Sequence, residues 1–201
     1  MDDAELCVLV MNNILSKRTM APISLENYRD WFDFPLIKYY QRLGFDEEQD
    51  TFEKISYEFI EEYEVSCLEC ELHKSTKSIL KKLKKRGMSH SILSAYRQEP
   101  LNKIVAYYRI ASYFIELIGQ DNIYAEGKIE KGKAWMKNIH FKPEEVLLVG
   151  DTVHDFEVAE SMGVDCLLVS HGHHSVGRLE GCGASVVHSL EEVEAYLLNG
   201  S

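Results

Sequence analysis

The chain has 201 residues, a length that suits one domain or two small ones, and its 45% hydrophobic and 27% charged residues are ordinary for a folded protein. The formal net charge of −11 argues against nucleic acid or an anionic membrane as a partner, because phosphate groups attract basic surfaces. No apolar run approaches the ~20 residues of a membrane span, and the acidic start Met1–Glu5 does not resemble a basic signal peptide. We therefore expect a cytoplasmic protein.

The five cysteines form no recognisable disulfide framework, which agrees with a reducing compartment. Cys67 and Cys70 form a lone C-x-x-C pair, with His73 three residues further on. A zinc site usually needs a second pair of ligands, and none follows at a suitable spacing. We therefore favour two thiols at the end of a helix over a metal site.

The first 70 residues show helical periodicity and no strand pattern. Helices are predicted from Ala4 to about Ser16, after a cap at Ser24, between Pro35 and Gly44, and from about Glu47 to Glu64. Aromatic residues are frequent on the apolar faces of these segments. We interpret them as packing between helices and not as a cofactor site.

From residue 75 onward, helices and strands alternate, which is typical of a parallel α/β sheet. The expected order is a helix at Ser75–Gly87, a strand at His90–Ala95, a loop to Pro100, a helix at Leu101–Tyr108, short strand pieces at Phe114–Ile118 and Asn122–Ala125, and a helix at Lys131–Ile139. The first of these helices carries many lysines, which we interpret as a solvated outer face and not as a nucleic-acid site.

The most informative stretch is Val146–Ser170, which predicts a strand, a loop, a helix and a second strand. Four apolar residues end in Gly150 and Asp151, and a second acid, Asp155, follows four residues later. Ligands of open α/β sheets bind at the carboxyl ends of the strands, where paired carboxylates suit Mg²⁺. The alternative for both acids is helix N-capping, a common role of aspartate.

The remaining residues are predicted to contain a loop rich in histidine, a short strand at Ala184–Val187, and a last helix from Ser189 or Leu190. The loop carries three histidines within His171–His174, which raises a zinc hypothesis. We prefer a polar loop at the rim of the site.

The motif Gly150-Asp-Thr-x-x-Asp155, followed by Ala159-x-x-x-Gly163, resembles the fourth motif of the haloacid dehalogenase-like superfamily, in its phosphoglycolate phosphatase-like branch. This resemblance implies an α/β fold, with a Rossmann-like core of parallel strands and an inserted all-helical cap. On this basis, residues 1–4 are what remains of the first core loop, residues 5–73 form the cap, and residues 74–201 form the core.

The resemblance also implies the roles of individual residues. Ser94 matches the second motif, so its hydroxyl and the backbone N–H of Ala95 are expected to bind phosphate. The alternative is that Ser94 is an ordinary serine at the end of a strand. Asp151 is expected to ligate Mg²⁺, and Asp155 either ligates it too or orients a ligand or water molecule. The catalytic set is completed by a lysine.

Lys128 is the best match to the lysine of the third motif, because a helix and then the central strand follow it at about the family spacing. Its ammonium would offset negative charge during phosphoryl transfer. Lys131 and Lys133 lie close enough to be alternatives for this role. For each of these lysines, a solvated side chain without a catalytic role is the other interpretation.

The first motif of the family, a strand followed by Asp-x-Asp-Gly-Thr that carries the nucleophile, is not found. Asp2–Glu5 resembles the residues that follow that motif, so we expect the chain to begin roughly ten to fifteen residues late, about one strand and a loop. In the family this strand lies between the one ending at Ser94 and the one ending at Gly150. We therefore expect either a slot in the sheet or direct pairing of its neighbours.

The expected function is Mg²⁺-dependent hydrolysis of a small phosphorylated metabolite, through an aspartyl-phosphate whose nucleophile this sequence does not supply. A phosphomutase or a dehalogenase is less favoured. The alternative function is a non-catalytic protein of the same fold that binds a phosphorylated ligand or a protein partner. The sequence indicates neither the substrate nor the oligomeric state.

Overall fold

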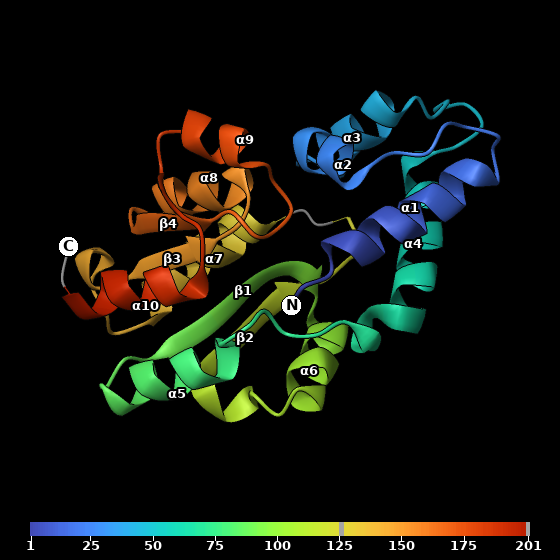
Figure 1. Cartoon of the computed structure of the whole chain (residues 1–201). Coiled ribbons are helices and arrows are strands. Elements are labelled where there is room, and N and C mark those ends of the chain that lie inside the picture. The colour runs from blue at the N-terminus through green and yellow to red at the C-terminus, as the bar shows by residue number, and fades with distance from the viewer. Residues whose placement is uncertain (125–126, 200–201) are drawn as a thin grey trace.

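The computed structural model describes residues 1–124 and 127–199, and it has an α/β fold in which helices flank sheets of parallel strands (Figure 1). The first part is helical throughout. Its helices are α1 (Ala4–Ser16), α2 (Leu25–Trp31), α3 (Leu36–Leu43) and α4 (Phe52–Ser66), and they lie together beside the sheets. Their buried side chains form a cluster of their own, as the aromatic pattern predicts.

Local capping sets the limits of these helices. Ser24 caps α2 as predicted, since its hydroxyl accepts a hydrogen bond from the backbone N–H of Asn27 at 3.0 Å. The prediction that the fourth helix begins near Glu47 was wrong by about one turn. Thr51 starts α4 by accepting from the N–H of Lys54, and the residues before it form a turn.

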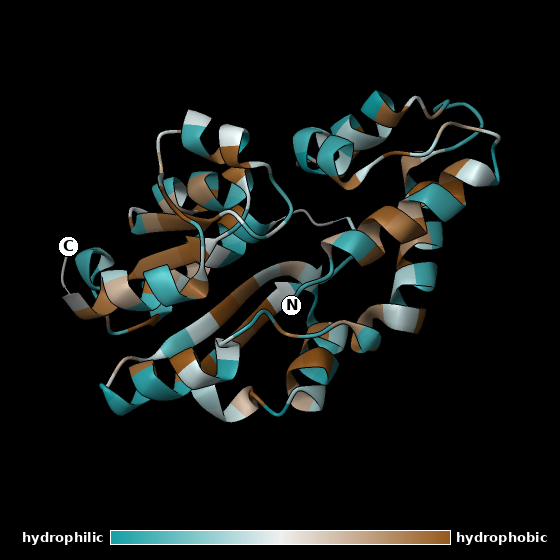
Figure 2. Ribbon diagram, viewed as in Figure 1, coloured by the Kyte–Doolittle hydropathy of each residue, from teal (hydrophilic) through white to brown (hydrophobic). Residues whose placement is uncertain are grey.

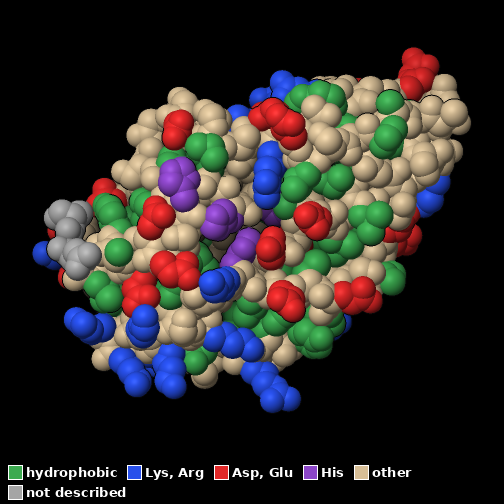
Figure 3. All heavy atoms as spheres, in the orientation of Figure 1, with side chains coloured by type: hydrophobic (Ala, Val, Ile, Leu, Met, Phe, Trp, Pro, Cys, Tyr) green, Lys and Arg blue, Asp and Glu red, His purple; other side chains and the backbone are tan. Residues whose placement is uncertain are grey.

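The second part alternates helices and strands as predicted. Its elements are α5 (Thr76–Lys85), β1 (His90–Arg97), α6 (Gln98–Tyr107), β2 (Phe114–Gln120), α7 (Lys128–Asn138), β3 (Leu147–Gly150), α8 (Val153–Met162), β4 (Asp165–Val169), α9 (Val176–Gly181), β5 (Ser185–Val187) and α10 (Leu190–Asn199). The lysines of α5 are exposed while Ile79 and Leu83 are buried. Figure 3 shows basic side chains gathered along this edge of the molecule, which confirms the solvated outer face.

Several boundaries differ from the prediction. The loop expected before Pro100 is absent, because β1 continues to Arg97 and the proline lies in the first turn of α6, where it is tolerated. Helix α9 was not predicted. Asn122–Tyr124 is not a strand, and Ala125, the end of that predicted piece, lies outside the described residues.

The described strands form two separate sheets, one with the order β1–β2 and one with the order β3–β4–β5, and every pair is parallel. Helices join the two sheets, since α7 packs on both β1 and α8, and α5 packs on α10. Figure 2 shows hydrophobic residues along β3 and β4, as expected for a sheet covered by helices. β1 and β3 do not pair with each other. Of the two expected arrangements, the structure therefore has the slot between these strands.

In the part of the chain that the structure describes, none of the helices combines the length and the hydropathy needed to cross a membrane.

Candidate functional site

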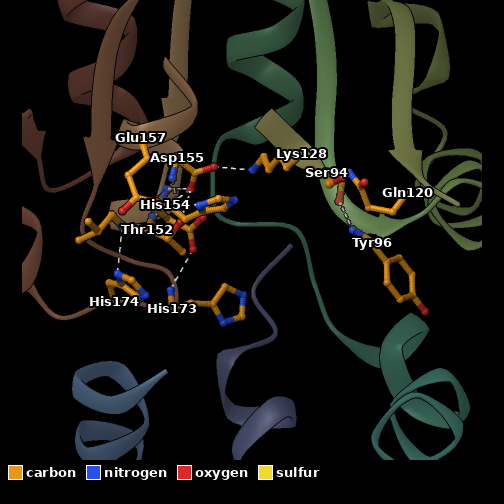
Figure 4. A network of polar contacts seen from close by, with 12 residues as sticks. Ser94, Tyr96, Gln120, Lys128, Thr152, His154, Asp155, Glu157, His173 and His174 are labelled. Atoms are coloured by element: carbon orange, nitrogen blue, oxygen red, sulfur yellow. Dashed lines mark hydrogen bonds and ion pairs between the residues drawn. The ribbon is translucent and has the colours of Figure 1, made fainter. Parts of the chain in front are cut away.

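The candidate site lies at the carboxyl ends of β1 and β3, the edge at which open α/β sheets bind ligands. Ser94, Ala95, Lys128, Asp151 and Asp155 all line one cavity of about 1080 Å³. Figure 4 shows the side chain of Lys128 between Ser94 on β1 and Asp155 on α8. The structure therefore brings the residues predicted from separate motifs to one place.

Asp151 directly follows the last residue of β3. Its Oδ2 accepts a hydrogen bond from the backbone N–H of His173 at 2.9 Å, which ties it to the loop after β4. Its Oδ1 has no hydrogen-bond partner among residues 1–124 and 127–199. One oxygen thus fixes the carboxylate, while the other is available to a ligand or cation.

Asp155 is buried and fully engaged. Its Oδ2 accepts hydrogen bonds from the N–H of Asp151 at 3.1 Å and from the N–H and hydroxyl of Thr152 at 3.0 and 2.7 Å. Thr152 in turn caps α8 by accepting from the N–H of Asp155. Helix capping, the alternative interpretation, therefore applies to Asp155, which forms a capping box with the N-cap residue Thr152, and not to Asp151.

Lys128 forms an ion pair with Oδ1 of Asp155, and the two side chains are only 12% and 6% exposed. Burial raises the pKa of the Asp155 carboxyl, but Lys128 and the hydrogen bonds outweigh it and lower the pKa to about 2. Asp155 is therefore an anion at neutral pH. In this arrangement it orients Lys128 and the Asp151 backbone, which favours the positioning role over direct metal ligation.

The two alternative lysines point elsewhere. Lys131 donates to the carbonyl oxygen of Gly119 at 2.7 Å and to Asp121 at 3.0 Å, while Lys133 pairs with Glu130 on its own helix. Neither lines the cavity that contains Asp151. Lys128 reaches the cavity because α7 begins at this residue, three positions earlier than predicted, after Gly127 in the left-handed conformation at φ 87°.

Ser94 lies where β1 departs from regular pairing with β2, between Leu93 and Arg97. Its hydroxyl oxygen accepts a hydrogen bond from the N–H of Tyr96 at 3.1 Å, so the hydroxyl hydrogen remains available to a ligand. Its carbonyl oxygen accepts from the side chain of buried Gln120 at 2.8 Å. Both contacts hold this segment in a bend that faces the cavity.

A second group of polar residues lies beside Asp151, on the loop that the sequence placed at the rim of the site and at the start of the chain. The carboxylate of Asp3 accepts from the hydroxyl of Tyr63 at 2.5 Å and lies 3.5 Å from Nε2 of His173. The hydroxyl of Tyr28 is 2.8 Å from the other ring nitrogen of His173. The sequence indicated the acidic start as a part of the first core loop and the histidine loop as the rim of the site, but it did not predict that Asp3 and His173 contact each other.

These contacts shift the pKa values of the pair. Burial raises the pKa of Asp3, but His173 and Tyr63 outweigh it, so the net shift is downward. Burial lowers the pKa of His173, but Asp3 and Asp151 reverse the effect and raise it. Asp3 and His173 therefore each favour the charged form of the other, and their contact links the start of α1 to the loop holding Asp151.

His174 lies in the interior of the protein, against the start of α8. Its ring is fully buried, and Nδ1 accepts from the N–H of Val153, the first residue of α8. Burial and nearby Arg178 lower its pKa to about 4, so it is neutral. Among the described residues, no three His, Cys, Asp or Glu side chains are placed to hold a metal ion, so neither zinc hypothesis gains support. Figure 3 shows the histidines gathered near the middle of this face.

Comparison with known proteins places this geometry in a family. A family model described as haloacid dehalogenase-like hydrolase matches residues 1–169. A comparison with curated proteins found no match.

Solved structures share the fold at low sequence identity. A predicted phosphatase from Clostridium acetobutylicum has a TM-score of 0.82 at 19% identity, with 99% of this chain and 93% of that chain covered. A haloacid dehalogenase-like hydrolase from Streptococcus pneumoniae has a TM-score of 0.82 at 16% identity, with 97% and 92% covered. A predicted phosphoglycolate phosphatase from Haemophilus somnus has a TM-score of 0.74 at 17% identity, with 95% and 90% covered.

Proposed function

The chain belongs to the haloacid dehalogenase-like hydrolase family, and from this premise we propose that it binds small phosphorylated metabolites and hydrolyses phosphate monoesters with Mg²⁺ in the cytoplasm. One observation carries the proposal: a hydroxyl, an ammonium and a carboxylate from three separate elements line one cavity at the carboxyl edge of the strands. Ser94, Lys128 and Asp151 supply these groups.

The phosphate would lie between Ser94 and Lys128. The Ser94 hydroxyl and the backbone N–H of Ala95 are hydrogen-bond donors, and charge-assisted bonds to a phosphate are among the stronger polar contacts. The Lys128 ammonium is held in place by Asp155, so it needs little reorganisation when charge develops on the transferring phosphoryl group.

The residues present fit a Mg²⁺ ion that takes most of its ligands from phosphate and water. Mg²⁺ in proteins commonly takes one or two carboxylates and completes its shell with phosphate oxygens and water. Asp151 offers the open Oδ1, and Asp155 fixes the backbone of Asp151 from behind. When bound, the cation would neutralise charge on the phosphate.

The helical part would act as a cap, with residues 5–73 covering a core formed by residues 74–201. Arg29 on α2 donates to the carbonyl oxygen of Gly172 at 3.0 Å, and Tyr28 meets His173. These contacts join the cap to the loop that fixes Asp151. A cap closed in this way excludes water from a bound phosphate.

A second candidate function is phosphate binding without hydrolysis. It is favoured by one observation: Asp3, a further acid that lines the cavity, is occupied by Tyr63 and His173. In this candidate, the same three residues hold the ligand and no carboxylate attacks it.

The test is release of phosphate from p-nitrophenyl phosphate with and without Mg²⁺. Hydrolysis predicts Mg²⁺-dependent release that Asp151→Asn abolishes while the fold is retained. Asp165→Asn is the matched control, because Asp165 is exposed at the opposite end of a neighbouring strand. No release, combined with a melting temperature that rises with phosphate, would support the binding function instead. Release that Asp151→Asn leaves unchanged would contradict the assignment of the site.

A further inference from the structure

The cavity of the candidate site extends from Asp151 into the helical part of the chain. Asp3 and His173 line it beside Asp151, because the His173 backbone N–H donates to the Asp151 carboxylate and the His173 ring lies 3.5 Å from Asp3. Further lining residues come from α1 to α4 and from the segment between α2 and α3. We call the part of the cavity that residues in the range 7–63 line its helical end.

Aromatic side chains dominate the lining of the helical end. Tyr28, Phe32 and Tyr39 form one group, with ring centroids 5.1 to 5.9 Å apart. Phe59 stacks on Tyr63 at 5.9 Å. Phe32 and Phe59 are only half-buried, so the protein leaves part of each ring uncovered. Such rings bind a flat apolar group through stacking and edge contacts.

The polar groups of the helical end carry no charge. No Lys, Arg, His, Asp or Glu between residues 7 and 63 lines the cavity. Burial raises the pKa values of Tyr39 and Tyr63, so both phenols stay neutral at neutral pH. A charged ligand group placed here would lose its hydration without gaining a counter-charge.

One phenol of the helical end also lacks a partner. The Tyr39 hydroxyl is buried and makes no hydrogen bond with the described residues. Buried polar groups are almost always hydrogen-bonded, so a polar atom on an uncharged ligand would supply the missing partner.

The cationic side chains beside Asp151 are already paired. Lys128 forms its ion pair with Asp155 (Figure 4), and His173 lies against Asp3. Asp151 adds a third carboxylate to these two cations. A second anionic group on a bound phosphate ester would therefore find no free cationic side chain in this region.

The other charged side chains of the cavity lie at its opposite end. Within residues 1–124 and 127–199 these are His90 and Glu145. His90 begins β1 and Glu145 precedes β3, so both lie at the amino ends of strands, whereas Asp151 follows a carboxyl end. They do not supply the missing counter-charge.

We propose that the phosphorylated ligand of this site carries an uncharged aromatic group, which lies in the helical end while the phosphate lies between Ser94 and Lys128. This inference rests on the proposed phosphate site and adds the chemical class of the ligand. Aryl and arylalkyl phosphates meet the requirement, whereas phosphorylated carboxylic acids and bisphosphates do not. The aromatic group gains from burial, and a second anion would be repelled by Asp3.

The probes are three phosphonates, whose carbon–phosphorus bond is not a phosphate ester and is not hydrolysed as one. Phenylphosphonate carries a ring, propylphosphonate an apolar chain, and 3-phosphonopropionate a chain of similar length that ends in a carboxylate. Each is titrated calorimetrically into the intact protein in Mg²⁺. We expect phenylphosphonate to bind at least fivefold tighter than propylphosphonate, and 3-phosphonopropionate at least tenfold weaker than propylphosphonate.

A variant places a cation in the helical end. Phe59→Lys should shift the ratio of affinities for 3-phosphonopropionate and phenylphosphonate at least tenfold toward the carboxylate. Tyr57→Lys is the matched control, because Tyr57 lies on the same helix, is 54% exposed and does not line the cavity. Phe59→Leu keeps an apolar side chain, and it should reduce the preference for phenylphosphonate over propylphosphonate even if the lysine variant does not fold.

Equal binding of phenylphosphonate and propylphosphonate, or tightest binding of 3-phosphonopropionate, would overturn this inference and leave the phosphate site standing. A preference for the ring that both Phe59 variants leave unchanged would overturn it too, since the ring would then lie elsewhere. Absence of binding by all three phosphonates would contradict the phosphate site itself, and the inference with it. The two failures are therefore distinguishable.

Discussion

Gly172 faces the carboxylate of Asp151 so closely that a β-carbon at position 172 would lie 1.8 Å from Oδ2. The next residue, His173, donates its backbone N–H to the same oxygen. The loop after β4 therefore holds Asp151 by approaching it with bare backbone. Only glycine permits this approach, and the position of the open Oδ1 depends on it.

Replacing Gly172 with alanine is expected to displace Asp151, because atoms 1.8 Å apart cannot coexist. We expect the Gly172→Ala variant to lose at least tenfold in Mg²⁺-dependent phosphate binding, measured by calorimetry. Gly177→Ala is the control, since no atom lies within 4 Å of the added carbon. A Gly172→Ala variant that binds as well as the original chain would show that Asp151 is not a ligand.

Replacing Lys128 with methionine is expected to destabilise the fold, because it leaves the buried Asp155 carboxylate without its partner. Removing one member of a buried ion pair costs about 3–5 kcal/mol, measurable by urea denaturation. Lys133→Met is the control, because the Lys133–Glu130 pair is exposed and is worth about 0–1 kcal/mol.

The same argument predicts partial rescue. In the double variant Lys128→Met with Asp155→Asn, the uncompensated charge is gone, so stability should exceed that of Lys128→Met alone. A double variant that is less stable than the single one would mean that Asp155 stabilises the fold through Thr152 and not through its charge pair.

Substitutions at Thr152 test the contribution of the cap of α8 to stability. Its hydroxyl accepts from the N–H of Asp155 at 3.2 Å and donates to the carboxylate of the same residue. Thr152→Val keeps the shape but removes both bonds, and should cost about 1–2 kcal/mol in thermal or urea unfolding. Thr152→Ser keeps the hydroxyl and should cost less than half as much. Equal losses would point to packing as the cause.

The lowered pKa of His174 predicts that the stability of the fold depends on pH. Its folded-state pKa of about 4 lies below the ordinary value of 6.5, so the unfolded chain binds the proton more readily. The stability that neutral His174 contributes, on the order of 2 kcal/mol, is fully present above pH ~6.5 and is lost as the pH falls toward ~4. Urea midpoints measured between pH 7 and pH 4.5 check this.

The variant His174→Asn is the comparison for this pH series, because asparagine can accept from the N–H of Val153 and does not titrate. Its stability should fall less steeply between pH 7 and pH 4.5. A variant with the same slope as the original chain would assign the loss to other groups, such as the buried carboxylates.

The helices and strands could be predicted because their apolar spacing and capping residues are local signals. Ser24, Gly44 and the Gly150–Asp155 stretch each specify structure within a few residues. Asp151 and Ser94 were found because the motifs that they match place each near the carboxyl end of a strand, although these two strands belong to separate sheets. The junction of Asp3 with His173 was not predicted, since the two lie 170 positions apart and no periodicity links them.

The roles of individual side chains were harder to predict than their location. That Lys128 and not Lys131 enters the cavity depends on where α7 begins, and this start is set by the left-handed Gly127. The engagement of Asp155 by Lys128 and Thr152 depends on tertiary packing. Sequence spacing alone could place these residues near the site but could not decide which oxygen remains open.

The central claim is that Ser94, Lys128 and Asp151 form a phosphate site completed by Mg²⁺, and calorimetric titration of inorganic phosphate into the protein tests it most directly. We predict one site per chain, with binding at least tenfold tighter in Mg²⁺ than in EDTA and abolished by Ser94→Ala with Asp151→Asn. Undetectable binding at millimolar phosphate in Mg²⁺, or binding that this double variant leaves unchanged, would contradict the account.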